Sequence, residues 1–163
     1  MSVTVVYPGT FDPITKGHEH LISRASRLFD KVIVGVAKSL PKGTYFTLDE
    51  RIEMAKSVLT SYPNVEVIGF AGLLSDFLKQ HDSTVILRGL RAASDFEYEF
   101  QMAGMNQILS PEVDTLFFTP GRDSMFISSS LVREIAVLGG DVSAFVSPQI
   151  IERFRQKLTK QIK

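Results

Sequence analysis

Cationic and hydroxyl side chains gather in short segments of the sequence, each of which follows an apolar run. Such side chains, together with the free N–H groups of a helix N-terminus, are the groups that bind phosphate in proteins. Their spacing therefore indicates a site for phosphate groups rather than for an apolar ligand. The segments are residues 9–18, 38–42, 88–91 and 120–130.

The apolar runs predict the strands that would position these segments. They are β-branched and nearly continuous, which is typical of strands covered on both faces. Segments of helical period lie between and after them, so the pattern predicts an α/β fold: a doubly wound, five-stranded parallel sheet with C-terminal helices, in a single domain of residues 1–163. The expected strands are 3–7, 32–37, 65–70, 84–87 and 115–119, and the expected helices are 18–29, 48–59, 96–109, 131–138 and a last one from Pro148.

Helix boundaries are marked by capping residues. Thr47 and Ser94 each stand three residues before a glutamate, the pattern of a capping box. The serines at 128–130 supply N-cap donors and acceptors for the helix that follows, and the Gly139-Gly140 pair indicates its end.

In a doubly wound sheet, ligands bind beyond the carboxyl ends of the strands, where the strand order reverses. All the polar segments follow strands, so we expect them to meet at one edge. Gly9 lets the backbone approach a ligand closely, and Gly17-His18 begins a helix whose free N–H groups can hold an anion beside the imidazole. Arg88 and Arg91 are close enough to share phosphate oxygens.

Composition excludes several other classes of protein. The 163 residues are 44% hydrophobic and 22% charged with a formal net charge of zero, so neither nucleic acid nor a membrane is an expected partner. The absence of cysteine excludes disulfides and thiolate ligands. The sequence has no P-loop, no dinucleotide fingerprint and no pattern of a protein metal site. With no signal peptide pattern, we expect a cytoplasmic protein.

The expected helix 96–109 has more apolar residues than one buried stripe can hold. The helix is therefore either enclosed within the chain or packed against another subunit. We favour self-association.

Two motifs resemble a known superfamily. Residues 15–18 read T-K-G-H and residues 127–133 read I-S-S-S-L-V-R, which is similar to the signature pair of the HxGH-type nucleotidyltransferases. Three longer strings, Y-P-G-T-F-D-P-I-T-K-G-H at 7–18, F-T-L-D-E-R at 46–51 and R-G-L-R-A-A-S-D-F-E-Y-E at 88–99, resemble the bacterial phosphopantetheine adenylyltransferases.

That resemblance implies a Rossmann-like nucleotidyltransferase fold and a reaction. ATP and 4′-phosphopantetheine would give dephospho-coenzyme A and pyrophosphate, with Mg²⁺ bound through the phosphates. The attacking group is already a phosphate, so positioning and charge stabilisation suffice for catalysis. The resemblance also implies a homohexamer and feedback inhibition by coenzyme A.

The resemblance assigns roles to individual residues. His18, Thr10, Lys42 and Arg88 would be catalytic, with His18 stabilising the transition state. Thr10, Lys42, Leu74 and Arg88 would bind the pantetheine substrate. The ATP-binding residues would be Thr10, Phe11, His18, Gly89, Leu90, Arg91, Glu99, Ser124, Met125, Phe126, Ile127, Ser128, Ser129 and Ser130.

Two alternatives stay open. The first keeps the fold and reaction but changes the acceptor, to nicotinamide mononucleotide or glycerol 3-phosphate. The second is a nucleotide-binding regulator without catalysis, which would have no need of the acceptor-binding cations Lys42 and Arg88.

Overall fold

The structure is a computed structural model that describes residues 1–39 and 43–162. Within these residues, five parallel strands form one sheet in the order β3-β2-β1-β4-β5. The chain runs outward from β1 to β3 and then crosses back to β4, so the predicted doubly wound sheet is confirmed. The strands are β1 (Thr4–Gly9), β2 (Lys31–Ala37), β3 (Val65–Phe70), β4 (Val85–Gly89) and β5 (Asp114–Phe118).

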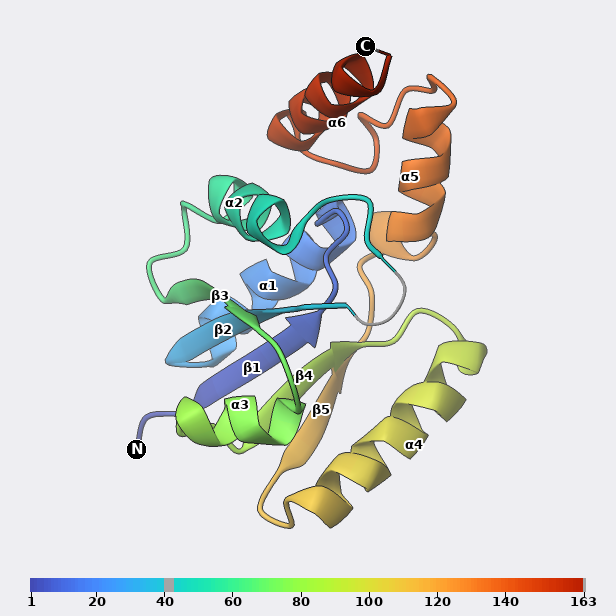
Figure 1. Ribbon diagram of the computed structural model, residues 1–163. Helices are drawn as coiled ribbons and strands as arrows, with labels where there is room; N and C mark the ends of the chain where they lie inside the picture. The colour runs from blue at the N-terminus through green and yellow to red at the C-terminus, as the bar shows by residue number, and fades with distance from the viewer. Residues whose placement is uncertain (40–42, 163) are drawn as a thin grey trace.

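Helices cover both faces of the sheet. Figure 1 shows α1 and α2 on one face, α3 and α4 on the other, and α5 and α6 beyond α2 near the C-terminus. These positions follow from right-handed crossovers between parallel strands. The helices are α1 (Lys16–Leu28), α2 (Leu48–Val58), α3 (Leu74–Gln80), α4 (Ala93–Leu109), α5 (Ser129–Val137) and α6 (Pro148–Gln161), with a 3₁₀ turn η1 (Arg122–Ser124) before α5.

The two faces of the sheet form two apolar cores. Val5 and Tyr7 of β1 point into the larger core with α1, α2, α5 and α6, whereas Val6 between them points into the smaller core with Phe77 and Leu78 of α3. Successive side chains of a strand alternate between faces, so a run apolar at every position supplies both cores.

The predicted helix starts are confirmed in part. Thr47 and Glu50 form the expected capping box of α2, and Ser128 caps α5 by accepting the backbone N–H of Leu131. The capping box expected at Ser94 is wrong, because α4 already begins at Ala93.

The apolar helix α4 is not enclosed within the chain. Its packing against the described residues is confined largely to the face that carries the buried Glu99. The other faces leave large apolar side chains exposed, so the first of the two alternatives for this helix is wrong. The exposed residues are Phe96, Tyr98, Phe100, Met102, Met105, Ile108 and Leu109.

None of the helices in the described part of the chain combines the length and apolar character that crossing a bilayer requires.

Candidate active site

A pocket of about 550 Å³ opens at the carboxyl ends of β1 and β4. These strands are neighbours, but the connections that follow them lead to opposite faces of the sheet. The pocket therefore lies at the switch point, where ligands of doubly wound sheets bind. Its walls come from the segments after β1, β2, β4 and β5, with Ser39 the described residue of the predicted segment after β2, and from the first residues of α1 and α5, as the sequence predicted.

His18 lies in the first turn of α1 and is fixed there by a capping box. Thr15 is the N-cap: its hydroxyl oxygen accepts the backbone N–H of His18, and its own backbone N–H donates to Nδ1 of the imidazole at 2.9 Å. A backbone N–H can only donate, so Nδ1 is the acceptor and the proton of the neutral ring is on Nε2.

The surroundings of His18 keep its ring neutral. Burial, together with the positive charges of Arg91 and Arg88, lowers the pKa of His18 to about 3. At neutral pH the imidazole thus offers a single N–H donor, at Nε2, on a side chain that lines the pocket.

Arg88 near the end of β4 is held in one orientation. Its Nε donates to Glu99 of α4 at 2.9 Å, its Nη2 donates to the other oxygen of the same carboxylate, and its Nη1 donates to the Pro8 carbonyl at 2.7 Å. These bonds use three of the five guanidinium N–H groups, which leaves one N–H on Nη1 and one on Nη2. Burial lowers the pKa of Arg88, but the hydrogen bond and charge of Glu99 raise it by more, so the group stays cationic.

Arg91 connects the segment after β4 to the segment before α5. Its Nη1 donates to the Ile127 carbonyl at 2.8 Å, and its Nε lies 3.4 Å from the Asp95 carboxylate. Arg88 and Arg91 both line the pocket, so the wall formed by β4 carries two fixed positive charges.

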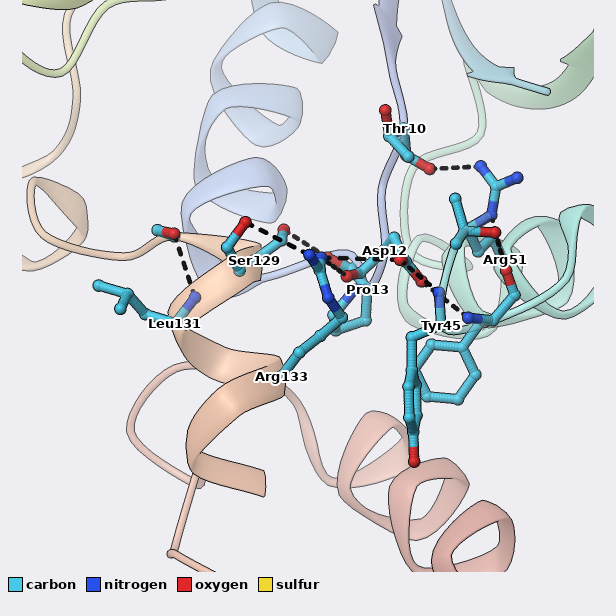
Figure 2. Close-up of polar contacts among 12 residues, drawn as sticks. Thr10, Asp12, Pro13, Tyr45, Arg51, Ser129, Leu131 and Arg133 are labelled. Atoms are coloured by element: carbon cyan, nitrogen blue, oxygen red, sulfur yellow. Dashed lines mark hydrogen bonds and ion pairs between the residues drawn. The ribbon is translucent and has the colours of Figure 1, made fainter. Parts of the chain in front are cut away.

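The serines at the start of α5 also line the pocket, and their hydroxyls are engaged with the protein. Ser128 caps the helix, Ser129 donates to the Pro13 carbonyl at 2.9 Å, and Ser130 accepts from Arg133 at 3.3 Å. The helix N-terminus is thereby joined to the loop after β1 (Figure 2).

The loop after β1 is held from both sides. Arg133 donates to the Asp12 carbonyl at 2.6 Å, and the buried Asp12 carboxylate accepts the backbone N–H groups of Tyr45 and Phe46 at 2.8 and 2.9 Å. Figure 2 shows these bonds as one continuous network, which ends at Arg51 and the Thr10 carbonyl.

Most of the predicted site residues meet at this pocket. Those that line it are Thr10, Phe11, His18, Arg88, Gly89, Leu90, Arg91, Glu99, Ser124, Ile127, Ser128, Ser129 and Ser130.

Three of the predicted residues that the structure describes are not among the lining residues. Leu74 packs against the smaller core at the start of α3, and Met125 and Phe126 are 45% and 87% exposed beside the pocket. Lys42 lies outside the described residues.

The prediction also missed residues that the structure places at the site. Arg24, His20 and Arg133 line the pocket without having been assigned to it. Arg133 ends the quoted I-S-S-S-L-V-R motif, which could have indicated it. Arg24 and His20 come from later turns of α1, and no local pattern marks them.

A model of the cytidylyltransferase-like family matches residues 6–135, which places this fold, with the pocket at its switch point, among the nucleotidyltransferases. Two solved structures share the fold. A putative nicotinate-nucleotide adenylyltransferase from Vibrio parahaemolyticus is 15% identical, with a TM-score of 0.71 over 99% of this chain and 97% of the other. Nicotinic acid mononucleotide adenylyltransferase from Plasmodium falciparum is 16% identical, with a TM-score of 0.72 over 96% of both chains.

The sequence narrows this class to one family. The phosphopantetheine adenylyltransferase of Nitrosomonas eutropha is 65% identical over 94% of this chain and 93% of its own, and that of Aromatoleum aromaticum is 63% identical over 94% of both. The chain belongs to the phosphopantetheine adenylyltransferase family. The resemblance inferred from the strings at 7–18, 46–51 and 88–99 is confirmed.

Proposed function

We propose that the pocket at the switch point is where this chain carries out the reaction of its family, and that His18, Thr10, Arg88 and Lys42 carry out the chemistry. The reaction transfers the adenylyl group of ATP to 4′-phosphopantetheine. An oxygen of the pantetheine phosphate forms a bond to the α-phosphorus of ATP, and the bond from that phosphorus to the bridging oxygen of pyrophosphate breaks.

The attacking phosphate is mostly dianionic at neutral pH, because its second pKa is about 6. It needs no general base, and no covalent intermediate with the protein is required. The enzyme must instead bring two anions together in line and stabilise the charge that develops on the α-phosphate and the leaving pyrophosphate.

His18 is suited to stabilise that charge. Because Thr15 occupies Nδ1, the Nε2–H of the neutral ring is the donor available to an α-phosphate oxygen. A fixed donor aimed at developing charge contributes without reorganisation during the reaction. This bond from Thr15 to Nδ1 is the observation that carries the proposed mechanism. Thr10, which lines the same pocket, is proposed to contact the phosphoryl centre beside His18.

Arg88 is proposed to hold the incoming phosphate together with Lys42. The support comes from its fixed orientation: the bonds to Glu99 and Pro8 leave one N–H on Nη1 and one on Nη2 for phosphate oxygens. Leu74 is proposed to contact the pantetheine arm, and this assignment comes from the family resemblance alone.

ATP is proposed to bind along the walls formed after β4, after β5 and at the start of α5. The fixed charge of Arg91 and the N-terminus of α5 suit its phosphates. The proposed residues are Phe11, Gly89, Leu90, Arg91, Glu99 and the segment Ser124, Met125, Phe126, Ile127, Ser128, Ser129 and Ser130.

Mg²⁺ is proposed to accompany ATP. In the residues that the structure describes, no group of three or more His, Asp or Glu side chains is arranged to hold a metal ion. An ion that takes its ligands mainly from phosphate oxygens, which Mg²⁺ prefers, fits this arrangement. When bound, the ion would neutralise phosphate charge.

Assembly, regulation and location are also proposals. The exposed apolar side chains of α4 support a homo-oligomer, and the family resemblance suggests a hexamer. We further propose inhibition by coenzyme A, the end product of the pathway, and a cytoplasmic location, where ATP is available.

The test is pyrophosphate release with ATP and each of three acceptors in parallel: 4′-phosphopantetheine, nicotinamide mononucleotide and glycerol 3-phosphate. We expect release with the pantetheine substrate alone. Pyrophosphate release with another acceptor would show that the proposed acceptor is wrong. No release with any of the three, in a protein that still binds ATP, would favour a nucleotide-binding regulator without catalysis.

A further inference from the structure

Arg51 of α2 is the largest of the fully buried side chains and is only 2% exposed. A buried charge is costly unless its donors find partners, so the contacts of this guanidinium need an explanation. In the described part of the chain, no carboxylate lies within the 4.0 Å distance of an ion pair with Arg51.

Among the residues that the structure describes, the hydrogen-bond acceptors of Arg51 are all backbone carbonyls. Nε donates to Phe46 at 3.2 Å, and Nη1 donates to both Thr10 and Ala37, at 2.7 and 2.9 Å. One guanidinium thus joins the loop after β1, the last residue of β2 and the segment that enters α2. Figure 2 shows the bond to Thr10, the shortest of the three.

The Thr10 carbonyl belongs to the peptide group between Thr10 and Phe11. In a trans peptide the C=O and the N–H point in opposite directions. Thr10 and Phe11 line the pocket and Arg51 does not, so the carbonyl points away from the pocket. The Phe11 N–H then points toward it, and within residues 1–39 and 43–162 this N–H has no hydrogen-bond acceptor.

Phe11, whose N–H belongs to this peptide group, has an uncommon backbone conformation. Phe11 has a φ of 49°, in the left-handed region that residues other than glycine rarely adopt. Such a conformation persists only where surrounding contacts enforce it, and it often occurs at functional sites. The bond from Arg51 to the Thr10 carbonyl is one such contact, and the buried Phe11 ring, 4.9 Å from His18 between ring centroids, is another.

We propose that Arg51 is a positioning residue of the pocket: it holds the Thr10 carbonyl away from the pocket and so presents the Phe11 N–H to a phosphate group. This rests on the proposed function only in that the pocket binds phosphate. The positive charge at the carbonyl also polarises the peptide, which strengthens the N–H as a donor.

The test compares Arg51→Lys with the wild-type protein in the binding of ATP and of adenosine, measured by calorimetry without turnover. A lysine keeps the charge, but its single nitrogen cannot reproduce the guanidinium geometry. We expect ATP to bind roughly tenfold more weakly and adenosine to bind as before, because only ATP carries phosphates. Equal weakening of both ligands, or no weakening of ATP, would overturn the proposal.

Asn64→Ala is the matched control for stability. The Asn64 side chain also donates to two backbone carbonyls, those of Ser26 and Phe29, and it does not line the pocket. Its loss should lower the melting temperature and leave the affinities for ATP and adenosine unchanged.

A second experiment applies if Arg51→Lys does not fold. Replacing Phe11 with the matching α-hydroxy acid changes the amide to an ester, which removes the N–H and leaves Arg51 in place. We expect the same selective loss of ATP affinity, and normal ATP binding by the ester would overturn the proposal. If turnover with 4′-phosphopantetheine fails while these binding results hold, the proposed reaction is wrong and the role of Arg51 stands.

Discussion

The backbone N–H of Thr15 donates to Nδ1 of His18 at 2.9 Å, and this bond sets the chemical form of the imidazole. It is part of the capping box that begins α1, so the same contact that starts the helix also places the ring proton on Nε2. Local folding and the proposed chemistry therefore depend on one pair of residues.

The first prediction concerns stability and pH. In the unfolded chain His18 has an ordinary pKa near 6.5, and in the folded protein burial and the charges of Arg91 and Arg88 lower it to about 3. Between these values the unfolded state binds the additional proton, so stability falls as the pH falls below about 6.5. His18→Gln removes the titrating group, and glutamine at this position still allows a capping box.

Thermal unfolding of both proteins between pH 7.5 and pH 5 tests this. The wild-type melting temperature should fall further than that of His18→Gln over this range. Parallel curves would mean that His18 titrates alike in the folded and unfolded states.

The second prediction concerns the ion pair between Arg88 and Glu99. The Glu99 carboxylate accepts two N–H groups of Arg88. Glu99→Gln replaces this charged acceptor with a neutral amide, and the amide holds Arg88 less firmly. We expect the KM for 4′-phosphopantetheine to rise about tenfold, in line with the loss of a charge-assisted hydrogen bond.

Glu97→Gln on the same helix is the control, because it removes the same charge from an exposed position. Its kinetics should match those of the wild-type protein. Equal effects of the two substitutions would show that net charge, not the orientation of Arg88, is responsible.

The third prediction concerns α4. Contiguous exposed apolar side chains of this extent are typical of an interface between proteins. Light scattering should give a mass several times the monomer mass of 18.2 kDa, and six times for a hexamer. Phe100→Glu and Ile108→Glu should reduce that mass, whereas a monomeric wild-type protein would contradict the interpretation of this helix.

The strands and most helices could be predicted because their signals are local. Continuous β-branched runs marked the strands, and Thr47 with Glu50 marked the start of α2. The position of α3 was not predicted, since it has only seven residues and Leu73 at its N-cap makes no side-chain cap.

The predicted start of α4 was wrong because the helix begins before Ser94, without a side-chain cap at its N-cap residue Ala92. The Asp95 carboxylate accepts the backbone N–H of Arg91 at 3.2 Å, and the helix begins at Ala93. The pattern at Ser94 and Glu97 could not reveal this contact.

The part of the site that is formed by strand ends and by the quoted motifs could be predicted from the sequence. The loops after β1, β4 and β5 converge because parallel strands end at one edge of a sheet. The roles of Glu99 and Arg51 depend on partners that are distant in sequence, Arg88 and Thr10, so no spacing rule reveals them. The lowered pKa of His18 likewise depends on burial and on Arg88 and Arg91, which only the folded chain brings together.

The most direct test of the account is single-turnover pyrophosphate release by His18→Ala with ATP and 4′-phosphopantetheine, with ATP affinity measured on the same protein. Losing one donor to the transition state should slow release by about 10²–10³-fold and leave the affinity for ATP within about threefold. Release within a few-fold of the wild-type rate would contradict the role proposed for His18.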